Sequence, residues 1–240
     1  MATRVIDDSK LQNIAVAIQG KDGGGTMTDD EMSTRIEQNL QSKAVLDSVI
    51  ARTATIIESD TTSVGTYAFY ENRKVETIKL NSALSCGVYA FRLCTNLRKI
   101  EMDNLTSVAG GYAFQQCISL TEVNLPKLQE IKQYLFLTCT SLIRAMFMSA
   151  TYFDVRPFQG CTSFTTLILG KRASLINGNI LNDSPNCIIY VKPEDLSWYS
   201  TATNWSTLYV QNRIKSIEDL TGDDLAWYQE QLARYQAQTA

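Results

Sequence analysis

The chain has 240 residues, 45% of them hydrophobic, with a net charge of −3, six cysteines and no histidine. It is long enough to bury a sizeable core, and it has no Lys/Arg-rich block that would favour nucleic acid or an anionic membrane as a partner. The absence of histidine excludes Ser-His-Asp and Cys-His catalysis and every histidine-containing metal site.

The first twenty residues, MATRVIDDSKLQNIAVAIQG, lack the apolar stretch of a secretory signal. The chain also has no run of 18 apolar residues, so we expect no membrane insertion. These features predict a protein made in the cytoplasm. Its cysteines are therefore expected to be thiols rather than disulfides.

Residues 1–50 are predicted to form a helical docking module. KDGGGT, residues 21–26, is interpreted as a linker between two helices, because it lacks the Gly-Lys-Ser/Thr ending of a phosphate-binding loop. Apolar residues at helical spacing give each helix one apolar face: Leu11, Ile14 and Ile18 in the first, and Met32, Ile36 and Leu40 in the second. These faces are expected to pack on each other, on the first repeat or on a partner.

Phenylalanine recurs through the middle of the chain at spacings of 22, 23, 22 and 22 residues: Phe69, Phe91, Phe114, Phe136 and Phe158. Most copies carry Tyr two residues before the Phe, and all carry apolar residues six, nine and eleven residues after it. A weaker sixth copy fits on Ile180. A period of this length is typical of a solenoid, in which one repeat cannot bury its own core and stacked neighbours can.

The positions nine and eleven after each Phe lie two residues apart, on one face of a short strand. Each repeat therefore supplies a strand to a parallel ladder, and the Tyr-Ala-Phe segment supplies a turn or short helix. The predicted fold is an α/β repeat solenoid over residues 60–191, with the helical module before it and a capped C-terminus in residues 192–240.

The pattern YAF-x-x-C-x-x-L-x-x-I-x-L resembles the BspA-like leucine-rich repeats. Five copies in register over about residues 60–191 carry this resemblance, which implies the fold. It implies little about function, because one fold serves many functions.

Four cysteines stand three residues after their Phe: Cys94, Cys117, Cys139 and Cys161. Catalytic cysteines are normally unique, so four equivalent ones favour a packing role as small buried residues that close a turn. A disulfide or metal column and a reactive thiol are the alternatives. Neither the spacing of the cysteines nor the predicted cytoplasmic compartment favours a disulfide or metal column.

Residues 192–219 are interpreted as the cap that closes the open end of the solenoid. Trp198, Tyr199 and Trp205 are expected to plug the core rather than to form a sugar-binding platform. A last helix is predicted over residues 221–238, where Leu225, Tyr228, Leu232 and Tyr235 form a short seam. The seam either packs on the solenoid or serves as a homo-oligomer contact.

The strand residues eight and ten after each Phe should point outward. The first three pairs are polar, whereas the last three form an apolar-rich candidate binding patch: Arg144, Met146, Thr166, Ile168, Ile188 and Tyr190. Such a patch usually marks a contact surface. The alternative is that the C-terminal cap or the last helix folds over it.

The opening IAVAIQGKDGGGTMTDDEM, residues 14–32, resembles the segment that precedes such repeats in bacteriophage virion proteins of gut bacteria, often tail-associated ones. Residues 187–219 resemble the terminal cap of BspA-like solenoids. The first resemblance implies a virion protein that binds other virion proteins or a host-surface receptor. The alternative is a bacterial surface adhesin or interaction protein of the BspA-like kind.

No catalytic residue, metal site or cofactor is predicted. Glu101 and Glu122 lie on adjacent predicted strands, but paired carboxylates on a solvated ladder are common, and glycosidase chemistry would need a cleft around them. We therefore expect the chain not to be an enzyme.

Overall fold

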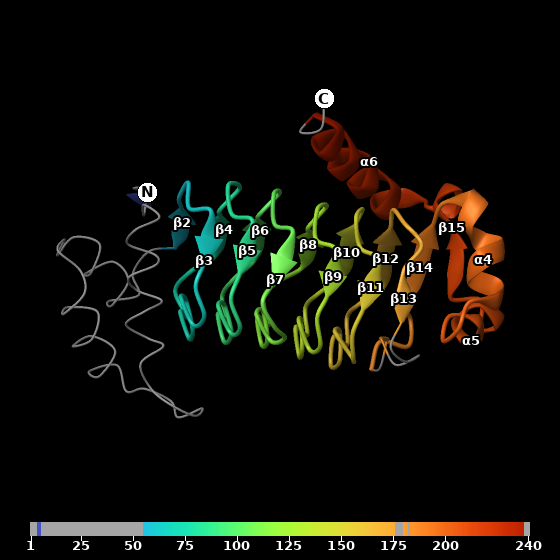
Figure 1. Ribbon diagram of the computed structural model, residues 1–240, viewed down its shortest axis with the longest axis horizontal. Helices are drawn as coiled ribbons and strands as arrows, with labels where there is room; N and C mark the ends of the chain where they lie inside the picture. The colour runs from blue at the N-terminus through green and yellow to red at the C-terminus, as the bar shows by residue number, and fades with distance from the viewer. Residues whose placement is uncertain (1–3, 6–54, 176–179, 182, 238–240) are drawn as a thin grey trace.

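The computed structural model describes residues 4–5, 55–175, 180–181 and 183–237. They form a parallel-strand solenoid in which each repeat contributes one turn of the rod, as Figure 1 shows. The predicted repeat architecture is confirmed. The segments between strands are turns, so the repeats themselves contain little helix.

One side of the rod carries the strands that the sequence predicts, divided between two sheets. The first sheet contains, in spatial order, β1 (Arg4–Val5), β2 (Ile56–Glu58), β4 (Thr77–Lys79) and β6 (Lys99–Glu101). The second contains β8 (Glu122–Asn124), β10 (Arg144–Phe147), β12 (Thr166–Leu169), β14 (Ile188–Val191) and β15 (Ile214–Ser216). All neighbouring strands in these two sheets are parallel, and across β2–β4–β6 and β8–β10–β12–β14 the register follows the repeat.

The adjoining side carries shorter strands of two residues each, which also fall into two sheets. The third sheet contains β3 (Ser63–Val64), β5 (Ser85–Cys86) and β7 (Ser107–Val108). The fourth contains β9 (Glu130–Ile131), β11 (Tyr152–Phe153) and β13 (Ser174–Leu175). The apolar slot seventeen residues after each Phe lies on these strands and faces the core.

The repeated phenylalanines form a continuous stack through the core. Successive ring centroids are 5.1, 5.2, 5.4 and 5.6 Å apart, with interplanar angles of at most 8°. These separations are close to the strand spacing of about 4.8 Å, so one ring fits each layer of the rod. Stacking of neighbouring repeats therefore closes the core that no single repeat can close.

The Tyr-Ala-Phe segment is a tight turn. The tyrosine of each complete copy has a positive φ, between 52° and 65°: Tyr67, Tyr89, Tyr112 and Tyr134. Non-glycine residues adopt this region rarely, and it costs free energy. Neighbouring tyrosine rings lie 5.1–5.4 Å apart, so favourable ring contacts along the rod offset part of that cost.

The cysteine column has the packing role that the sequence predicts. Cys94, Cys117, Cys139 and Cys161 are buried free thiols. Each donates a hydrogen bond of 3.1–3.2 Å to the carbonyl oxygen of the phenylalanine in the preceding repeat. In the sixth copy the Ser184 hydroxyl makes a different bond between layers, to the carbonyl oxygen of Cys161 at 2.8 Å.

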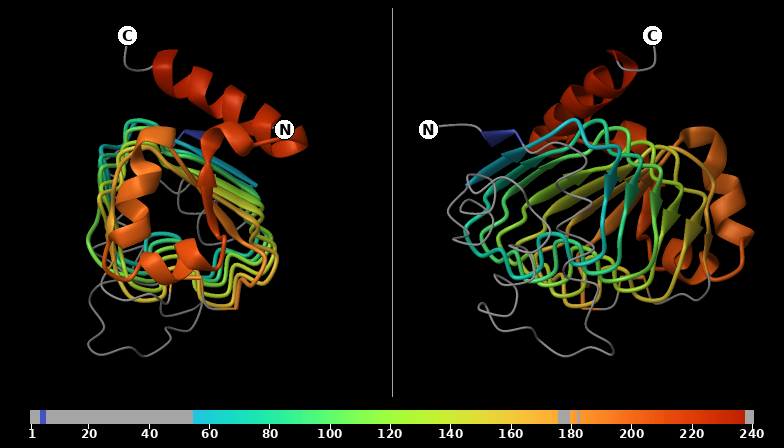
Figure 2. Two further views of the ribbon diagram at one scale, coloured as in Figure 1. Left: turned by 90° about the vertical axis from the view of Figure 1, so that its right-hand side faces the viewer. Right: turned by 60° about the vertical axis from the view of Figure 1, so that its left-hand side comes forward.

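A compact cap closes the C-terminal end of the rod, as the end-on view in Figure 2 shows. It contains η1 (Pro193–Asp195), α4 (Leu196–Thr201), α5 (Ser206–Val210) and the unpredicted strand β15. Tyr199 and Trp205 are fully buried, and the indole Nε1 of Trp205 donates to the carbonyl oxygen of Ala173 at 2.6 Å. The predicted plug is confirmed for these two residues, and Trp198 is partly buried beside them.

After β15 the chain passes through η2 (Ile217–Asp219) into α6 (Gly222–Ala237), which confirms the predicted last helix. The predicted docking residues Leu11, Ile14, Ile18, Met32, Ile36 and Leu40 lie outside the described residues. Arg4–Val5, from the same predicted module, form β1 at the edge of the first sheet.

Candidate functional site

The outward surface of the first and second sheets is the candidate site, and we call it the strand face. Helix α6 lies across one part of it (Figures 1 and 2). We call the part formed by β8, β10, β12 and β14 the covered half, and the part formed by β2, β4 and β6 the open half. The two halves correspond to the second and first sheets, so the boundary between them is also the boundary between sheets.

Apolar contact anchors α6 to the covered half. Met146 and Ile168 point outward from adjacent strands, yet both are fully buried, because the Trp227 side chain packs against them. Trp227 itself is only 6% exposed. This cluster is separate from the main core, so α6 adds a second, smaller apolar layer outside the solenoid.

Charged side chains surround this anchor. The Arg144 guanidinium Nε lies 2.9 Å from Asp224 Oδ1 and its Nη1 lies 3.4 Å from Glu122 Oε1. The same guanidinium lies over the Trp227 ring, 6.0 Å from its centroid, at cation–π distance. Asp224 also accepts a 2.7 Å hydrogen bond from the Thr166 hydroxyl.

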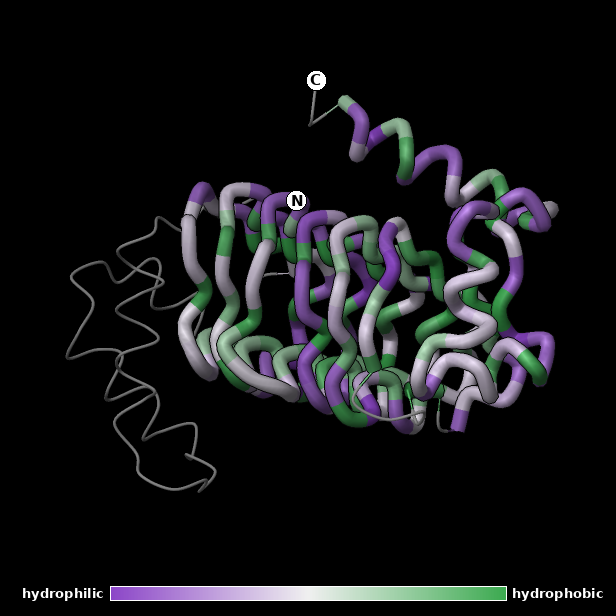
Figure 3. The backbone as a smooth tube through the Cα atoms, turned by 45° about the vertical axis from the view of Figure 1, so that its right-hand side comes forward, coloured by the Kyte–Doolittle hydropathy of each residue, from purple (hydrophilic) through white to green (hydrophobic). Residues whose placement is uncertain are grey.

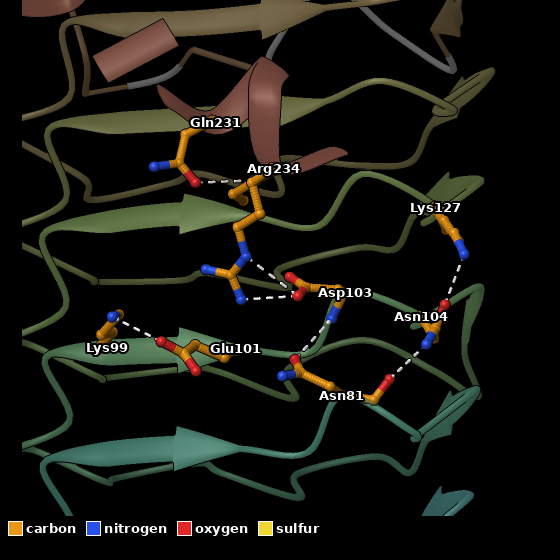
Figure 4. A network of polar contacts seen from close by, with 9 residues as sticks. Asn81, Lys99, Glu101, Asp103, Asn104, Lys127, Gln231 and Arg234 are labelled. Atoms are coloured by element: carbon orange, nitrogen blue, oxygen red, sulfur yellow. Dashed lines mark hydrogen bonds and ion pairs between the residues drawn. The ribbon is translucent and has the colours of Figure 1, made fainter. Parts of the chain in front are cut away.

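The C-terminal part of α6 reaches past the covered half, as Figure 4 shows. Gln231 Oε1 accepts a 2.9 Å hydrogen bond from Asn124 Nδ2 on β8. Three residues later, Arg234 Nε and Nη2 lie 3.2 and 2.7 Å from Asp103 Oδ2. Asp103 is the second residue after β6 of the first sheet, so α6 reaches from the covered half to the edge of the open half.

The six residues of the predicted binding patch are brought together by the structure. Arg144, Met146, Thr166 and Ile168 lie under α6, and Ile188 and Tyr190 are half-buried. The alternative that the last helix folds over the patch is therefore the arrangement observed. Burial raises the pKa of Tyr190, and the carboxylates of Asp224 and Asp219 raise it further. Partner binding by this patch stays a prediction and would require α6 to move.

The residues with which α6 contacts the solenoid are not the predicted seam. The contact stripe is Asp224, Trp227, Gln231 and Arg234, which repeats the 3-4-3 spacing one residue before the seam. Leu225 and Tyr228 flank Trp227 and are partly buried. Figure 3 shows the resulting mixture of hydrophilic and hydrophobic residues along the helix. The sequence did not single out this stripe, because three of its four members are polar.

The open half carries exposed charges of both signs. Lys79 Nζ lies 3.8 Å from Glu58 Oε2, and Lys99 Nζ lies 2.6 Å from Glu101 Oε1. The Lys99 side chain is 61% exposed. The Glu101 side chain is only 14% exposed, whereas Lys79 and Glu58 are 38% and 43% exposed. Ion pairs with exposed members add little stability, so Lys79, Glu58 and Lys99 can exchange their present partners for those of another protein.

Reactive or metal-binding chemistry has little support in the described residues. Burial raises the pKa of the Cys161 thiol to about 12 and raises those of Cys117 and Cys139 as well, which disfavours the nucleophilic thiolate. Over the described ranges, no group of three His, Cys, Asp or Glu side chains could hold a metal ion. Nor does any helix among these residues have the length and apolarity to cross a bilayer.

Comparison with known families identifies the repeats. Residues 62–188 match, in six copies, the model of the BspA type leucine rich repeat region, which accounts for more than half of the chain. The chain therefore belongs to the BspA-type leucine-rich-repeat family. A search of curated proteins finds no match.

Three solved structures share the fold. A leucine rich cell surface protein from Faecalibacterium prausnitzii matches with a TM-score of 0.52 and 23% identity, over 57% of this chain and 38% of that protein. The T. pallidum leucine rich repeat protein matches with a TM-score of 0.53 and 24% identity, over 58% of this chain and 69% of that one. The pneumococcal vaccine antigen PcpA matches with a TM-score of 0.51 and 13% identity, over 68% of this chain and 40% of that protein.

Proposed function

We propose that this chain is a non-enzymatic binding protein that uses the strand face of its solenoid to bind a protein partner. The observation that supports this most directly is the docking of α6. The strand face holds a helix through one apolar anchor and a ring of charged contacts, as protein interfaces do. The open half offers charged side chains of the same kind, and among the described residues only the C-terminal end of α6 reaches its edge, at Asp103.

The partner contact is therefore assigned to the open half. Its pairs Lys79–Glu58 and Lys99–Glu101 place both signs of charge on neighbouring strands, which favours a partner with a mixed-charge surface over a polyanion. The patch under α6 would contribute only after displacement of the helix, which must first give up the burial of Trp227.

Within this function, the finer proposal is a phage virion protein, tail-associated, that binds other virion proteins or a host-surface receptor. Its support is the resemblance of residues 14–32 to the opening segment of such proteins. The helices predicted from Leu11, Ile14, Ile18, Met32, Ile36 and Leu40 would then dock the chain to the particle.

A second candidate is a bacterial surface adhesin or interaction protein. Its support is that a solved structure with this fold is described as a cell surface protein and another as a vaccine antigen. Both candidates use the strand face for binding. They differ in whether the chain is attached to a phage particle or to a bacterial cell surface.

Mass spectrometry of purified phage particles and protease shaving of intact cells from the same culture separates the two. Peptides of this chain in particles banded in a density gradient would support the virion role. Peptides released from intact cells, with none in the particles, would overturn it and support the adhesin.

Charge reversal tests the binding face itself. The first experiment shows whether phage particles or bacterial cells retain the protein. Lys79→Glu together with Lys99→Glu should reduce the amount of protein bound to those particles or cells by about tenfold or more. Arg172→Glu is the matched control, because Arg172 pairs with Asp195 near the cap, away from the open half. Equal losses in both variants, or no loss in either, would overturn the assignment of the open half.

A further inference from the structure

We propose that the solenoid contains a built-in hinge between its second and third repeats, and that α6 is the clasp that spans it. The first observation is that the sheets on both sides of the rod are interrupted at one boundary. The first and third sheets end at β6 and β7, and the second and fourth begin at β8 and β9.

Among the described residues, two backbone hydrogen bonds that recur at other boundaries have no counterpart at this one. Leu80 N–H donates to the Glu101 carbonyl and Leu125 N–H to the Met146 carbonyl, at 2.8 and 3.2 Å. In the described chain no such bond joins Met102 N–H to the Asn124 carbonyl between them. On the other side, the bond from Asp154 N–H to the Ile131 carbonyl at 2.9 Å has no equivalent from Lys132 to Val108 in this same described region.

The sequence contains a local cause. The second repeat is the one with 23 residues, and the additional residue lies in Ala109-Gly110-Gly111, between β7 and Tyr112. Other copies have two residues at this place, such as Gly87-Val88 before Tyr89. The longer connection after β7 prevents β7 and β9 from pairing. A cavity of about 230 Å³ lies between the two strands and is lined by Ser107, Val108 and Glu130, among others.

The turns that contain Phe91 and Phe114 remain hydrogen-bonded to each other across this boundary. This bonded edge would act as the hinge axis. Phe91 N–H and Leu93 N–H donate to the carbonyls of Ala113 and Gln115, both at 2.8 Å. The rings of Phe91 and Phe114 stack 5.2 Å apart, as elsewhere in the column. The boundary therefore keeps its backbone hydrogen bonds along the turn edge, whereas along the β7 and β9 edge the bond from Gln129 N–H to the Thr106 carbonyl, at 3.3 Å, still joins the two repeats. A rod that is bonded more densely along one edge than along the other two can bend about the densely bonded edge.

The clasp is α6, because it is anchored on one side of this boundary and reaches the other. Trp227 and Asp224 hold it to β10 and β12, whereas Arg234 holds Asp103 after β6. The Asp103 side chain is only 7% exposed, so its pairing is stronger than that of a surface ion pair. Lys127 Nζ, which donates to Asn104 Oδ1 at 2.6 Å, adds a second link across the boundary (Figure 4).

This arrangement assigns α6 a positioning role for the proposed binding face. The open half lies on one side of the hinge and the covered half on the other, so the clasp sets the angle between them. A partner that binds the open half and also contacts α6 would bind one angle best, and release of Arg234 would lower its affinity by widening the range of angles.

Hydrogen exchange of the full chain with Arg234→Gln tests the hinge. Backbone amides of β6, β8 and the segments beside them should exchange at least about threefold faster, while those of β12 and β14 should not change. Arg172→Gln removes an ion pair that does not cross the boundary and serves as the matched control. Unchanged exchange at β6 and β8, or an equal increase in all strands, would overturn the clasp.

Deletion of Gly110 tests the cause of the hinge. It restores the two-residue connection of the other repeats, so β7 and β9 should pair and the amides near Lys132 and Val108 should become protected. In this background Arg234→Gln should no longer accelerate exchange at β6 and β8. Persistent acceleration would show that the extra residue does not produce the hinge. If the deletion variant does not fold, the exchange comparison in the natural chain still decides whether α6 is a clasp.

Discussion

The thiol of Cys117 donates a hydrogen bond to the carbonyl oxygen of Phe91, 3.2 Å away in the preceding repeat. Because Cys94, Cys139 and Cys161 make the same bond to their own preceding phenylalanines, the cysteine column is a set of links between layers. The thiol group thus joins the turn of one repeat to the backbone of the stacked phenylalanine in the preceding repeat.

Replacing Cys117 measures the strength of one such link. Cys117→Ala should lower the free energy of unfolding by about 1 kcal/mol, since it loses both a hydrogen bond and a buried sulfur, and it should leave partner binding intact. Cys117→Ser should cost less than Cys117→Val, because a serine hydroxyl can donate to the Phe91 carbonyl oxygen and a valine cannot. Urea denaturation measures the free energies of unfolding of the three variants and therefore their order of stability. A valine variant more stable than the serine variant would mean that apolar packing, not the hydrogen bond, explains the column.

The close approach of two repeats at Gly111 gives a larger effect. A Cβ atom on Gly111 would lie 2.1 Å from the Gln133 carbonyl oxygen, so the backbone would have to shift to accept it. Gly111→Ala should therefore destabilise the protein by about 2 kcal/mol or more. Gly222→Ala is the comparison: Gly222 has a φ of +56° but no atom within 4 Å of the added Cβ. Its cost should be only about 1 kcal/mol, from conformation alone. Equal costs measured by thermal unfolding would contradict the steric argument.

The repeat made much of this fold predictable. A slot that is apolar in five copies gives five observations of one environment, so the strand positions, the phenylalanine stack and the cysteine column followed from spacing alone. The Trp205 plug was predictable for a related reason, because an open solenoid end must be covered and Trp198, Tyr199 and Trp205 cluster shortly after the last repeat.

Contacts that occur once were not predictable in this way. Arg234 and Asp103 are 131 residues apart, and nothing in either local sequence signals the pairing. The stripe through Trp227 is mostly polar, so the apolar seam beside it gave the stronger signal. The spacing of 23 residues before Phe114 was visible in the sequence, but its effect on both sheets depends on how layers stack in space.

Helix α6 should detach when its anchor is removed. Trp227→Ala deletes the largest side chain in the layer that covers Met146 and Ile168, at a local cost of about 3 kcal/mol. Limited proteolysis should then cleave within residues 222–237 much faster than in the unmodified protein, while the repeats stay resistant. Tyr209→Ala is the control, because Tyr209 is an exposed aromatic residue of the cap. Unchanged cleavage in the Trp227 variant would show that the ion pairs alone hold the helix.

The same helix carries the predicted homo-oligomer contact. Leu225 and Tyr228 pack beside Trp227, which leaves less of the seam available to a second copy than the sequence predicts. We therefore expect the unmodified protein to scatter light as a monomer at high concentration, and Trp227→Ala, which frees the seam, to associate. A stable dimer of the unmodified protein would favour the oligomer contact over packing on the solenoid.

Buried thiols should make stability fall at high pH. Burial raises the pKa of the Cys161 thiol to about 12 in the folded protein, whereas an unfolded thiol titrates near 8.5. Below about pH 8.5 both states hold the proton, so the stabilising contribution is complete. As the pH rises toward 12, the unfolded chain loses the proton first, and stability declines by about 1.4 kcal/mol per pH unit for each such thiol.

Cys161→Ser isolates this effect from other groups that titrate in base. Serine does not ionise in this range, so the variant should lose stability less steeply between pH 9 and 11 by the slope of one thiol, about 1.4 kcal/mol per pH unit. Urea denaturation in the presence of a reductant, at intervals of half a pH unit, measures both slopes. Parallel curves for the variant and the unmodified protein would mean that the Cys161 thiol ionises in the folded state nearly as easily as in the unfolded one. Its burial would then have to be transient, which is the opposite of what a link between layers requires.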